Sequence, residues 1–236
     1  MKYKWLLFDA DGTLFDYDKA EKQALKNTFA QIGYPFEAHY LNEYQKINRA
    51  MWLDFEKGKI NQQRLRTRRF ELLFEAVNLH HDSQDFSAKY LANLAQGTYL
   101  IDGAEEIIKT LSTKFGIVII TNGLMDVQRP RFDQSSIRRY IKEIIISEEV
   151  GSAKPDKKIF DIAFERMNHP AKDEVIIIGD SLTSDIQGGH NYGIDTCWFN
   201  PEGKTNGQIT TTFEIQRLDQ LPKILESSSS TINEEN

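Results

Sequence analysis

Short apolar runs alternate with helical patterns in two parts of the chain: the first 15 residues and everything after Gly97. The run at 5–8 is apolar at every position and leads directly into Asp9 and Asp11. An apolar run this short is typical of a central strand in a parallel sheet, which is covered on both faces. We predict strands at 5–8, 115–120, 143–147, 175–178 and 195–199, and helices at 105–111, 155–167 and 184–192. This alternation predicts an α/β fold with a Rossmann-like parallel sheet core.

The segment between these parts is polar and has almost no strand signal. Its apolar residues recur at helical spacing in four stretches, near 20–32, 40–55, 61–77 and 86–94. Four antiparallel helices of this length make a small bundle. We therefore predict an α/β catalytic core of residues 1–15 and 97–226 with an inserted α-helical bundle cap at 16–96. A cap inserted after the first strand can act as a lid. The serine-rich, acidic tail at 227–236 is predicted to be disordered.

Composition narrows the classes of partner. The net charge of −6 provides no basic field for a nucleic acid, so we expect no DNA or RNA polymer as partner. Cys197 is the single cysteine, which excludes an intrachain disulfide. The N-terminus lacks a signal-peptide pattern, and no apolar segment is long enough to span a bilayer. We expect a cytoplasmic protein without a membrane partner, and the sequence leaves open whether it is a monomer or a homodimer.

Polar residues gather where the predicted strands end. The first strand is followed by Asp9 and Asp11, the second by Thr121, the third by Lys154 and the fourth by Asp180 and Asp185. The carboxyl ends of parallel strands are neighbours, so these groups are expected to converge on one cleft. Gly12 permits the turn that points both of the first carboxylates the same way.

Two carboxylates this close repel each other unless a cation neutralises them. Mg²⁺, which prefers oxygen ligands, is the simplest candidate. Each residue alone also fits an ordinary role: the aspartates could cap turns or helices, Thr121 could end a strand, and Lys154 could be solvated. All of these ordinary roles together would require independent coincidences, so we favour a functional site.

These residues resemble the motifs of the haloacid dehalogenase-like (HAD) hydrolase superfamily. Asp9-x-Asp11-x-Thr13 is similar to its first motif and Thr121-Asn122-Gly123 to its second. Lys154-Pro155 resembles the third motif, and Gly179-Asp180 with Asp185 resembles the fourth. The resemblance covers the chain from Lys4 to about Phe199, and the insertion resembles the helical type of cap in this superfamily.

The resemblance implies a metal held by the Asp9 carboxylate, the Asp11 backbone carbonyl and Asp180. Asp185 is then expected to orient the metal's waters or Lys154. In chemical terms Asp9 attacks phosphorus and forms an aspartyl-phosphate, while Asp11 protonates the leaving oxygen and later takes a proton from water. The metal, Lys154 and Thr121 neutralise the phosphate.

Asn122 and the neighbouring loop amides are further candidate donors to the phosphate. Asp11 favours phosphoryl transfer over dehalogenation, because a halide leaving group needs no acid and similar dehalogenases lack one at this position. A phosphomutase also needs this acid, so hydrolysis is the simpler default rather than the sole option. A non-enzymatic binding module that keeps the fold is a further alternative, although Asp9, Lys154 and Asp180 are all retained.

The predicted cap carries aromatic and basic residues that could meet a small phosphorylated substrate. Asn48, Trp52 and Arg69 are our candidate contacts, because aromatic faces stack on bases and amides pair with base edges. The alternative is that Trp52 belongs to the bundle core and the arginines to a solvated face. The cap and the Thr121-Asn122-Gly123 variant resemble the non-canonical pyrimidine nucleotidases of this superfamily. That resemblance implies a 5′-nucleotidase acting on nucleoside monophosphates; a sugar-phosphate or phosphoglycolate phosphatase is the second choice.

Overall fold

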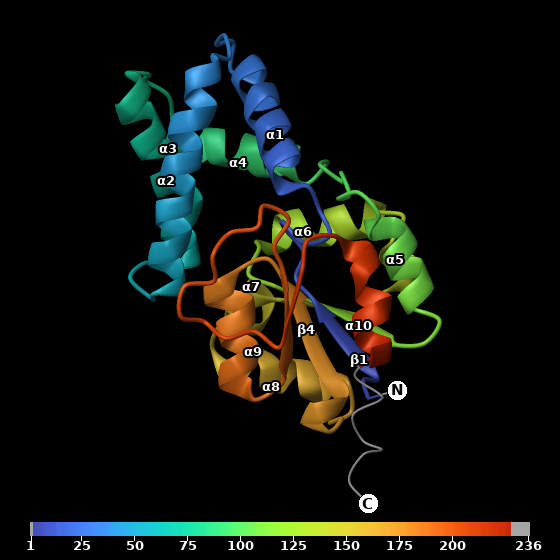
Figure 1. Ribbon diagram of the computed structural model, residues 1–236. Helices are drawn as coiled ribbons and strands as arrows, with labels where there is room; N and C mark the ends of the chain where they lie inside the picture. The colour runs from blue at the N-terminus through green and yellow to red at the C-terminus, as the bar shows by residue number, and fades with distance from the viewer. Residues whose placement is uncertain (1, 228–236) are drawn as a thin grey trace, which may run out of the picture. The chain divides into compact units, whose positions relative to one another are not determined.

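The computed structural model describes residues 2–227, which form two compact units (Figure 1). The α/β unit contains the residues up to Asp16, Leu100–Gly123 and the chain from Gln134 on. The helical unit contains Tyr17–Tyr99 and Leu124–Asp133. The predicted disordered tail lies outside the described residues, apart from Ser227 at the end of the last helix. Within residues 2–227, every helix is too short or too polar to cross a membrane.

The α/β unit is built on a parallel sheet of six strands in the order β3-β2-β1-β4-β5-β6. The strands are β1 (Trp5–Phe8), β2 (Gly116–Thr121), β3 (Glu143–Ile146), β4 (Val175–Gly179), β5 (Asp195–Phe199) and β6 (Phe213–Ile215). The predicted α/β class and parallel sheet are confirmed. The sequence did not predict β6, a three-residue edge strand in which only the last side chain is buried.

The middle strand, β1, determines where a ligand can bind. Phe8 is in register with Ile119 of β2 on one side and with Ile178 of β4 on the other. After β1 the chain forms β2 and β3 on one side of it, and later forms β4, β5 and β6 on its other side. Parallel sheets of this kind bind ligands at such a reversal of strand order, beyond the carboxyl ends of the strands.

Helices cover both faces of the sheet. They are α5 (Ala104–Leu111), α7 (Ser147–Val150), α8 (Lys157–Arg166), α9 (Gln187–Tyr192) and α10 (Leu221–Ser227). The apolar face of α8 joins a buried cluster with three neighbouring strands, formed by Ile159, Phe160, Ala163, Leu7, Val118 and Ile177. Figure 1 shows α5 and α10 across the sheet from α8 and α9. This two-sided cover explains why the strands are apolar at nearly every position.

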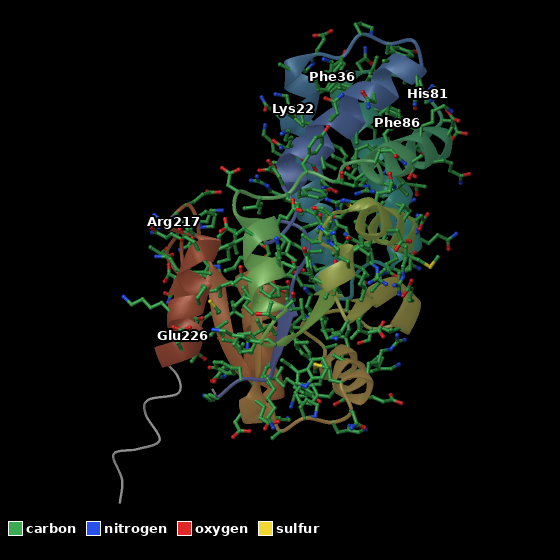
Figure 2. The ribbon with its side chains drawn as sticks, turned by 90° about the vertical axis from the view of Figure 1, so that its right-hand side faces the viewer. Lys22, Phe36, His81, Phe86, Arg217 and Glu226 are labelled. Carbon is green, nitrogen blue, oxygen red and sulfur yellow. The ribbon has the colours of Figure 1, made fainter. Side chains whose placement is uncertain are left out.

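The helical unit packs around a cluster of aromatic rings. Its helices are α1 (Tyr17–Gln31), α2 (Ala38–Glu56), α3 (Gln62–Val77), α4 (Ser83–Leu94) and α6 (Met125–Gln134). Phe86 of α4 is fully buried, and its ring centroid lies 5.1 Å from those of Phe29, Phe70 and Phe74 (Figure 2). These contacts tie α1, α3 and α4 together, as the helical spacing of their apolar residues predicts.

Helix α6 follows β2 in the chain but packs within the helical unit. Leu124 and Val127 are buried in the aromatic cluster of the bundle. Both guanidinium Nη atoms of Arg66 on α3 donate to the Asp126 carboxylate, at 2.8 and 2.6 Å. The sequence pattern predicts this segment in the α/β core, because its partners in the bundle are distant in sequence and leave no local pattern.

A buried chain of polar side chains crosses the bundle. Asn48 of α2 donates to the Glu21 carboxylate at 3.0 Å and to the Tyr17 hydroxyl at 3.1 Å. Arg69 of α3 donates through Nη1 to the Asn48 side-chain oxygen at 3.0 Å. The Arg69 guanidinium lies 5.0 Å from the ring centroid of Phe70. Asn48 and Arg69 are therefore parts of an internal network that links α1, α2 and α3.

Burial raises the pKa of Glu21 in this network to about 7, and the charge of Asp18 adds to the rise. Hydrogen bonds from Gln45, Tyr17 and Asn48 oppose it. An unfolded glutamate has a pKa of about 4.3. Between these two pH values the folded protein holds a proton that the unfolded chain has released, so this group makes stability fall as pH rises.

We predict that Glu21→Gln removes this loss of stability, because a neutral amide cannot titrate. The variant and the wild type should have similar unfolding free energies at pH 4, below the unfolded pKa. At pH 8 the variant should be more stable by up to about 4 kcal/mol, at about 1.4 kcal/mol per unit of pKa shift. Urea unfolding at both pH values measures the difference. Glu75→Gln, which removes an exposed carboxylate from α3, is the control. Equal effects of the two substitutions at pH 8 would contradict the assignment.

Candidate active site

Asp9 and Asp11 follow β1 on a tight turn at the centre of the sheet. The Asp9 N–H donates to the Ile178 carbonyl at 2.9 Å, which extends the ladder between β1 and β4 by one residue. The Phe15 N–H then donates to the Ala10 carbonyl at 2.8 Å and closes the turn. Asp9 is only 8% exposed, whereas Asp11 is half-buried. The two carboxylates thus occupy different depths of one turn.

Gly12 allows this turn to contact the end of β4. Its φ of +83° lies in the left-handed region that glycine adopts without strain. A Cβ atom at Gly12 would lie 2.6 Å from a carboxylate oxygen of Asp180, closer than atoms can approach. The Thr13 hydroxyl donates to the other Asp180 oxygen at 3.3 Å. A side chain at position 12 would therefore displace Asp180 from the turn that carries Asp9.

Lys154 lies at the centre of the site, with its side chain 1% exposed. Its ammonium donates to Asp9 Oδ1 at 2.5 Å, to the Ile120 carbonyl at 2.6 Å and to Asp185 Oδ1 at 2.7 Å. An ammonium has three protons, so each of them has an oxygen acceptor. Lys154 therefore holds the predicted nucleophile and the end of β2 together.

Asp185 is the most deeply buried of these carboxylates, with no exposed surface. Its Oδ2 atom accepts a hydrogen bond from the Ser181 N–H at 3.0 Å. The close packing requires a glycine in β4, because a Cβ atom on Gly179 would lie 2.2 Å from Asp185 Oδ2. Both Asp185 oxygens are thus engaged, one by Lys154 and the other by Ser181.

Thr121 and Asn122 end β2 beside these groups. Thr121 is 2% exposed, and its hydroxyl accepts a hydrogen bond from the Gly123 N–H at 3.0 Å. Asn122 was predicted as a phosphate donor. Its side chain bonds the backbone of Lys154, accepting from the N–H at 2.8 Å and donating to the carbonyl at 2.9 Å. The sequence pattern placed Asn122 in the site but did not reveal this partner.

Negative charge exceeds positive charge in this cluster. One carboxylate oxygen each from Asp9, Asp180 and Asp185 lie within 4.8 Å of one another, around the single ammonium of Lys154. Burial raises the pKa of Asp9 well above its ordinary value, although Lys154 opposes this. Asp180 remains exposed as a residue, but loss of hydration at its carboxylate and the charge of Asp185 raise its pKa to about 7.

The pKa of Lys154 is also raised: burial alone would lower it, but the charges of Asp185 and Asp9 outweigh that effect. Lys154 is therefore charged at neutral pH, and three carboxyl groups share this one cation. A divalent cation with a preference for oxygen fits this donor set. Asp9 and Asp180 are better placed to hold it than Asp185, whose oxygens already have donors. The backbone of Asp11 belongs to the same turn as Asp9.

The three predicted contacts in the helical unit differ in their surroundings. Asn48 and Arg69 are 4% and 1% exposed and take part in the internal network of the bundle. Trp52 is half-buried, and its ring meets that of Phe55 with centroids 5.7 Å apart. Of the three residues, Trp52 is thus the most exposed to solvent.

The arginines predicted as a solvated face are largely ion-paired. Arg64 and Arg68 of α3 both bond the Glu71 carboxylate, at 3.2 and 2.8 Å. Arg66 pairs with Asp126 of α6. Arg69, which belongs to the same basic stretch, points inward instead. Its position could not be predicted from composition, because it depends on the helical phase of α3 relative to its neighbours.

Comparisons with known proteins place the chain among related hydrolases. The model of the haloacid dehalogenase-like hydrolase family matches residues 6–199. The chain is 34% identical to the pyrimidine 5′-nucleotidase YjjG of Escherichia coli, over 95% of this chain and 99% of that protein. It is 35% identical to the pyrimidine 5′-nucleotidase PynA of Streptococcus pneumoniae, over 97% of each chain.

A solved structure resembles the chain along nearly its whole length. It is the crystal structure of YfnB from Bacillus subtilis, a protein named as a HAD-hydrolase, bound to magnesium. The TM-score is 0.91 and the sequences are 38% identical, over 95% of this chain and 99% of that one. The fold that carries the four strand-end groups is therefore shared with this protein.

We predict that the buried contact between Lys154 and Asp185 produces strong coupling in stability. Lys154→Met leaves Asp9 and Asp185 buried without their cation and should lower the unfolding free energy by about 3–5 kcal/mol. Adding Asp185→Asn removes one of the unpaired charges, so the double variant should be more stable than Lys154→Met alone. Urea unfolding in the presence of a metal chelator measures this cycle.

The matched control is the exposed ion pair between Lys4 and Glu174, tested as Lys4→Met with Glu174→Gln. Solvent screens that pair, so its cycle should show little coupling. Effects of Lys154→Met and Asp185→Asn that add within about 0.5 kcal/mol would contradict the buried contact.

Proposed function

Because the chain belongs to the haloacid dehalogenase-like hydrolase family, we propose that it is a magnesium-dependent phosphatase, a 5′-nucleotidase for pyrimidine nucleoside monophosphates. The observation that carries the phosphatase proposal is the meeting of Asp9, Lys154 and Asp180 at the carboxyl ends of neighbouring strands. Homology to YjjG and PynA over nearly the whole chain supports the choice of nucleotide.

Asp9 is the proposed nucleophile. One of its carboxylate oxygens attacks phosphorus, the bond from phosphorus to the nucleoside oxygen breaks, and Asp9 becomes a mixed anhydride with phosphate. This step requires the ionised carboxylate, whereas burial favours the protonated form. Lys154, hydrogen bonded to Asp9 at 2.5 Å, opposes that effect and fixes the direction of the carboxylate.

Asp11 is the proposed acid and base. It gives a proton to the departing nucleoside oxygen, and in the second half of the reaction it accepts a proton from the water that attacks phosphorus. Its half-buried position, two residues after Asp9 on the same turn, suits contact with both the leaving group and water. A halide would need no such proton, so this residue favours phosphate esters as substrates.

Asp9, Asp180 and the backbone carbonyl of Asp11 are the proposed ligands of magnesium. When bound, the ion neutralises the phosphoryl oxygens and allows an anionic group to approach an anionic ester. Asp185 has another task, because its oxygens hold Lys154 and the Ser181 N–H. Thr121 is the proposed donor to the phosphate. It is the last residue of β2, and the preceding residue, Ile120, accepts a hydrogen bond from Lys154, so β2 positions both groups.

We predict that UMP, dUMP and dTMP are hydrolysed with kcat/KM at least about tenfold above that for ribose 5-phosphate or phosphoglycolate, a difference of about 1.4 kcal/mol in transition-state stabilisation. Phosphate release with each compound, measured in Mg²⁺ and again after chelation, tests this. Activity should disappear on chelation and return with added Mg²⁺.

Asp9→Asn is the matched control for these assays, because it keeps the size of the side chain and removes the nucleophile. It should abolish turnover of every substrate. Sugar phosphates that perform as well as the nucleotides would reject the nucleotidase proposal and leave the phosphatase proposal standing. Full activity of Asp9→Asn would reject both.

A further inference from the structure

The side chain of Asn122 satisfies both main-chain groups of a single residue, Lys154. Its oxygen accepts from the Lys154 N–H at 2.8 Å, and its nitrogen donates to the Lys154 carbonyl at 2.9 Å. The two residues are 32 positions apart in the chain. A closed pair of hydrogen bonds of this kind fixes both the position and the orientation of the Lys154 backbone.

Lys154 needs such support, because it lies between α7 and α8, outside any helix or strand. Its side chain must nevertheless place one nitrogen within 2.7 Å of three oxygens, one from the turn after β1, one from β2 and one from the segment after β4. A lysine has four rotatable side-chain bonds, and fixing all of them costs conformational entropy. A mobile backbone would add to that cost and spread the ammonium over many positions.

Asn122 is itself well anchored. It follows Thr121, the last residue of β2, whose Cα pairs with that of Ile146 on β3. Its own carbonyl accepts from the Ser147 hydroxyl at 3.0 Å, and Ser147 is 2% exposed at the start of α7. The sheet therefore holds Asn122, Asn122 holds the Lys154 backbone, and Lys154 holds Asp9.

We infer that Asn122 is a positioning residue for Lys154, and that its side chain serves the reaction by holding the ammonium against Asp9 instead of by binding phosphate. Its kinetic consequences rest on the proposed phosphatase function. The positioning of Lys154 by Asn122 does not rest on that function, because it concerns contacts within the α/β unit alone.

The chain offers a close control in Asn200. Its side chain bonds the backbone of Lys204 in the same way, accepting from the N–H at 2.9 Å and donating to the carbonyl at 2.8 Å. Lys204, however, is exposed and pairs with Glu202 rather than with the carboxylates of the site. Asn200→Ala thus removes an equivalent pair of hydrogen bonds, together with one from Asn200 Nδ2 to Glu214 at 2.6 Å, without removing a contact of Lys154.

The first measurement does not depend on catalysis. In protein labelled with ¹⁵N-lysine, NMR should show one buried, slowly exchanging ammonium that disappears in Lys154→Met. We expect Asn122→Ala to broaden or remove this signal and Asn200→Ala to leave it unchanged. An unchanged ammonium signal in Asn122→Ala would overturn the inference, whatever the enzymatic activity of the wild type.

The second measurement separates positioning from phosphate binding. Asn122→Ala should lower kcat for UMP by about ten- to a hundredfold, the cost of a misplaced catalytic group. KM and the inhibition constant of inorganic phosphate should change little, and Asn200→Ala should match the wild type in kcat. An increase of the phosphate inhibition constant with an unchanged kcat would assign Asn122 to phosphate and overturn the inference.

Asn122→Asp guards against failure of the alanine variant to fold. It keeps the acceptor for the Lys154 N–H and loses the donor to the Lys154 carbonyl, so we expect a kcat and an ammonium signal between those of wild type and Asn122→Ala. Wild-type values for both would overturn the inference. A wild-type enzyme without phosphatase activity toward any ester would reject the proposed function, and the NMR signals would then decide the positioning role alone.

Discussion

The arrangement of the site depends on the buried ion pairs that the Lys154 ammonium forms with Asp9 and Asp185. The ammonium lies in a space with almost no solvent, where each unpaired charge costs several kcal/mol. Asp9 and Asp185 both need it as a partner, and it needs them. β1, β2 and β4 must therefore end at the same level, because their ends or the segments after them supply the acceptors. The parallel order around β1 meets this requirement.

Small residues make the meeting of charges possible. Gly12 and Gly179 leave the space that the carboxylates of Asp180 and Asp185 occupy. Larger side chains at either position would separate the carboxylates, so the acidic cluster is specified by glycines as much as by acids. Carboxyl groups crowded in this way repel one another when they are ionised, and burial and this repulsion raise the pKa values of Asp9 and Asp180. A divalent cation would favour the ionised carboxylates, which links the packing of the α/β unit to its proposed chemistry.

Much of this could be predicted from the sequence. The apolar runs before Asp9, Thr121 and Asp180 indicated buried parallel strands, and the polar residues at their ends indicated one cleft. The structure brings these groups together. Such predictions succeed because the period of a strand and the direction of a parallel sheet are local properties that determine where the strand ends must lie.

Other features depended on pairings between distant segments and could not be predicted. Nothing local to Asn122 indicates a partner in the backbone of Lys154. The inward direction of Arg69 and the packing of α6 with α3 likewise follow from how helices fit together. The sequence predicts Lys154 as a phosphate ligand, and the structure adds three protein acceptors for its ammonium that no local pattern indicates. Hydrogen bonds between residues that are distant in sequence are thus the part of a site that sequence patterns predict least.

The central claim is that Asp9, held by Lys154, becomes phosphorylated and that Asp11 is needed to release the phosphate. Asp11→Asn tests it with an aryl phosphate, whose leaving group departs without a proton. Attack by Asp9 should then proceed while hydrolysis stalls, and peptide mass spectrometry after an acid quench should find phosphate on the peptide that contains residue 9. The double variant with Asp9→Asn should carry none. Phosphate on a different residue, or unimpeded phosphate release by Asp11→Asn without any labelled peptide, would contradict the claim.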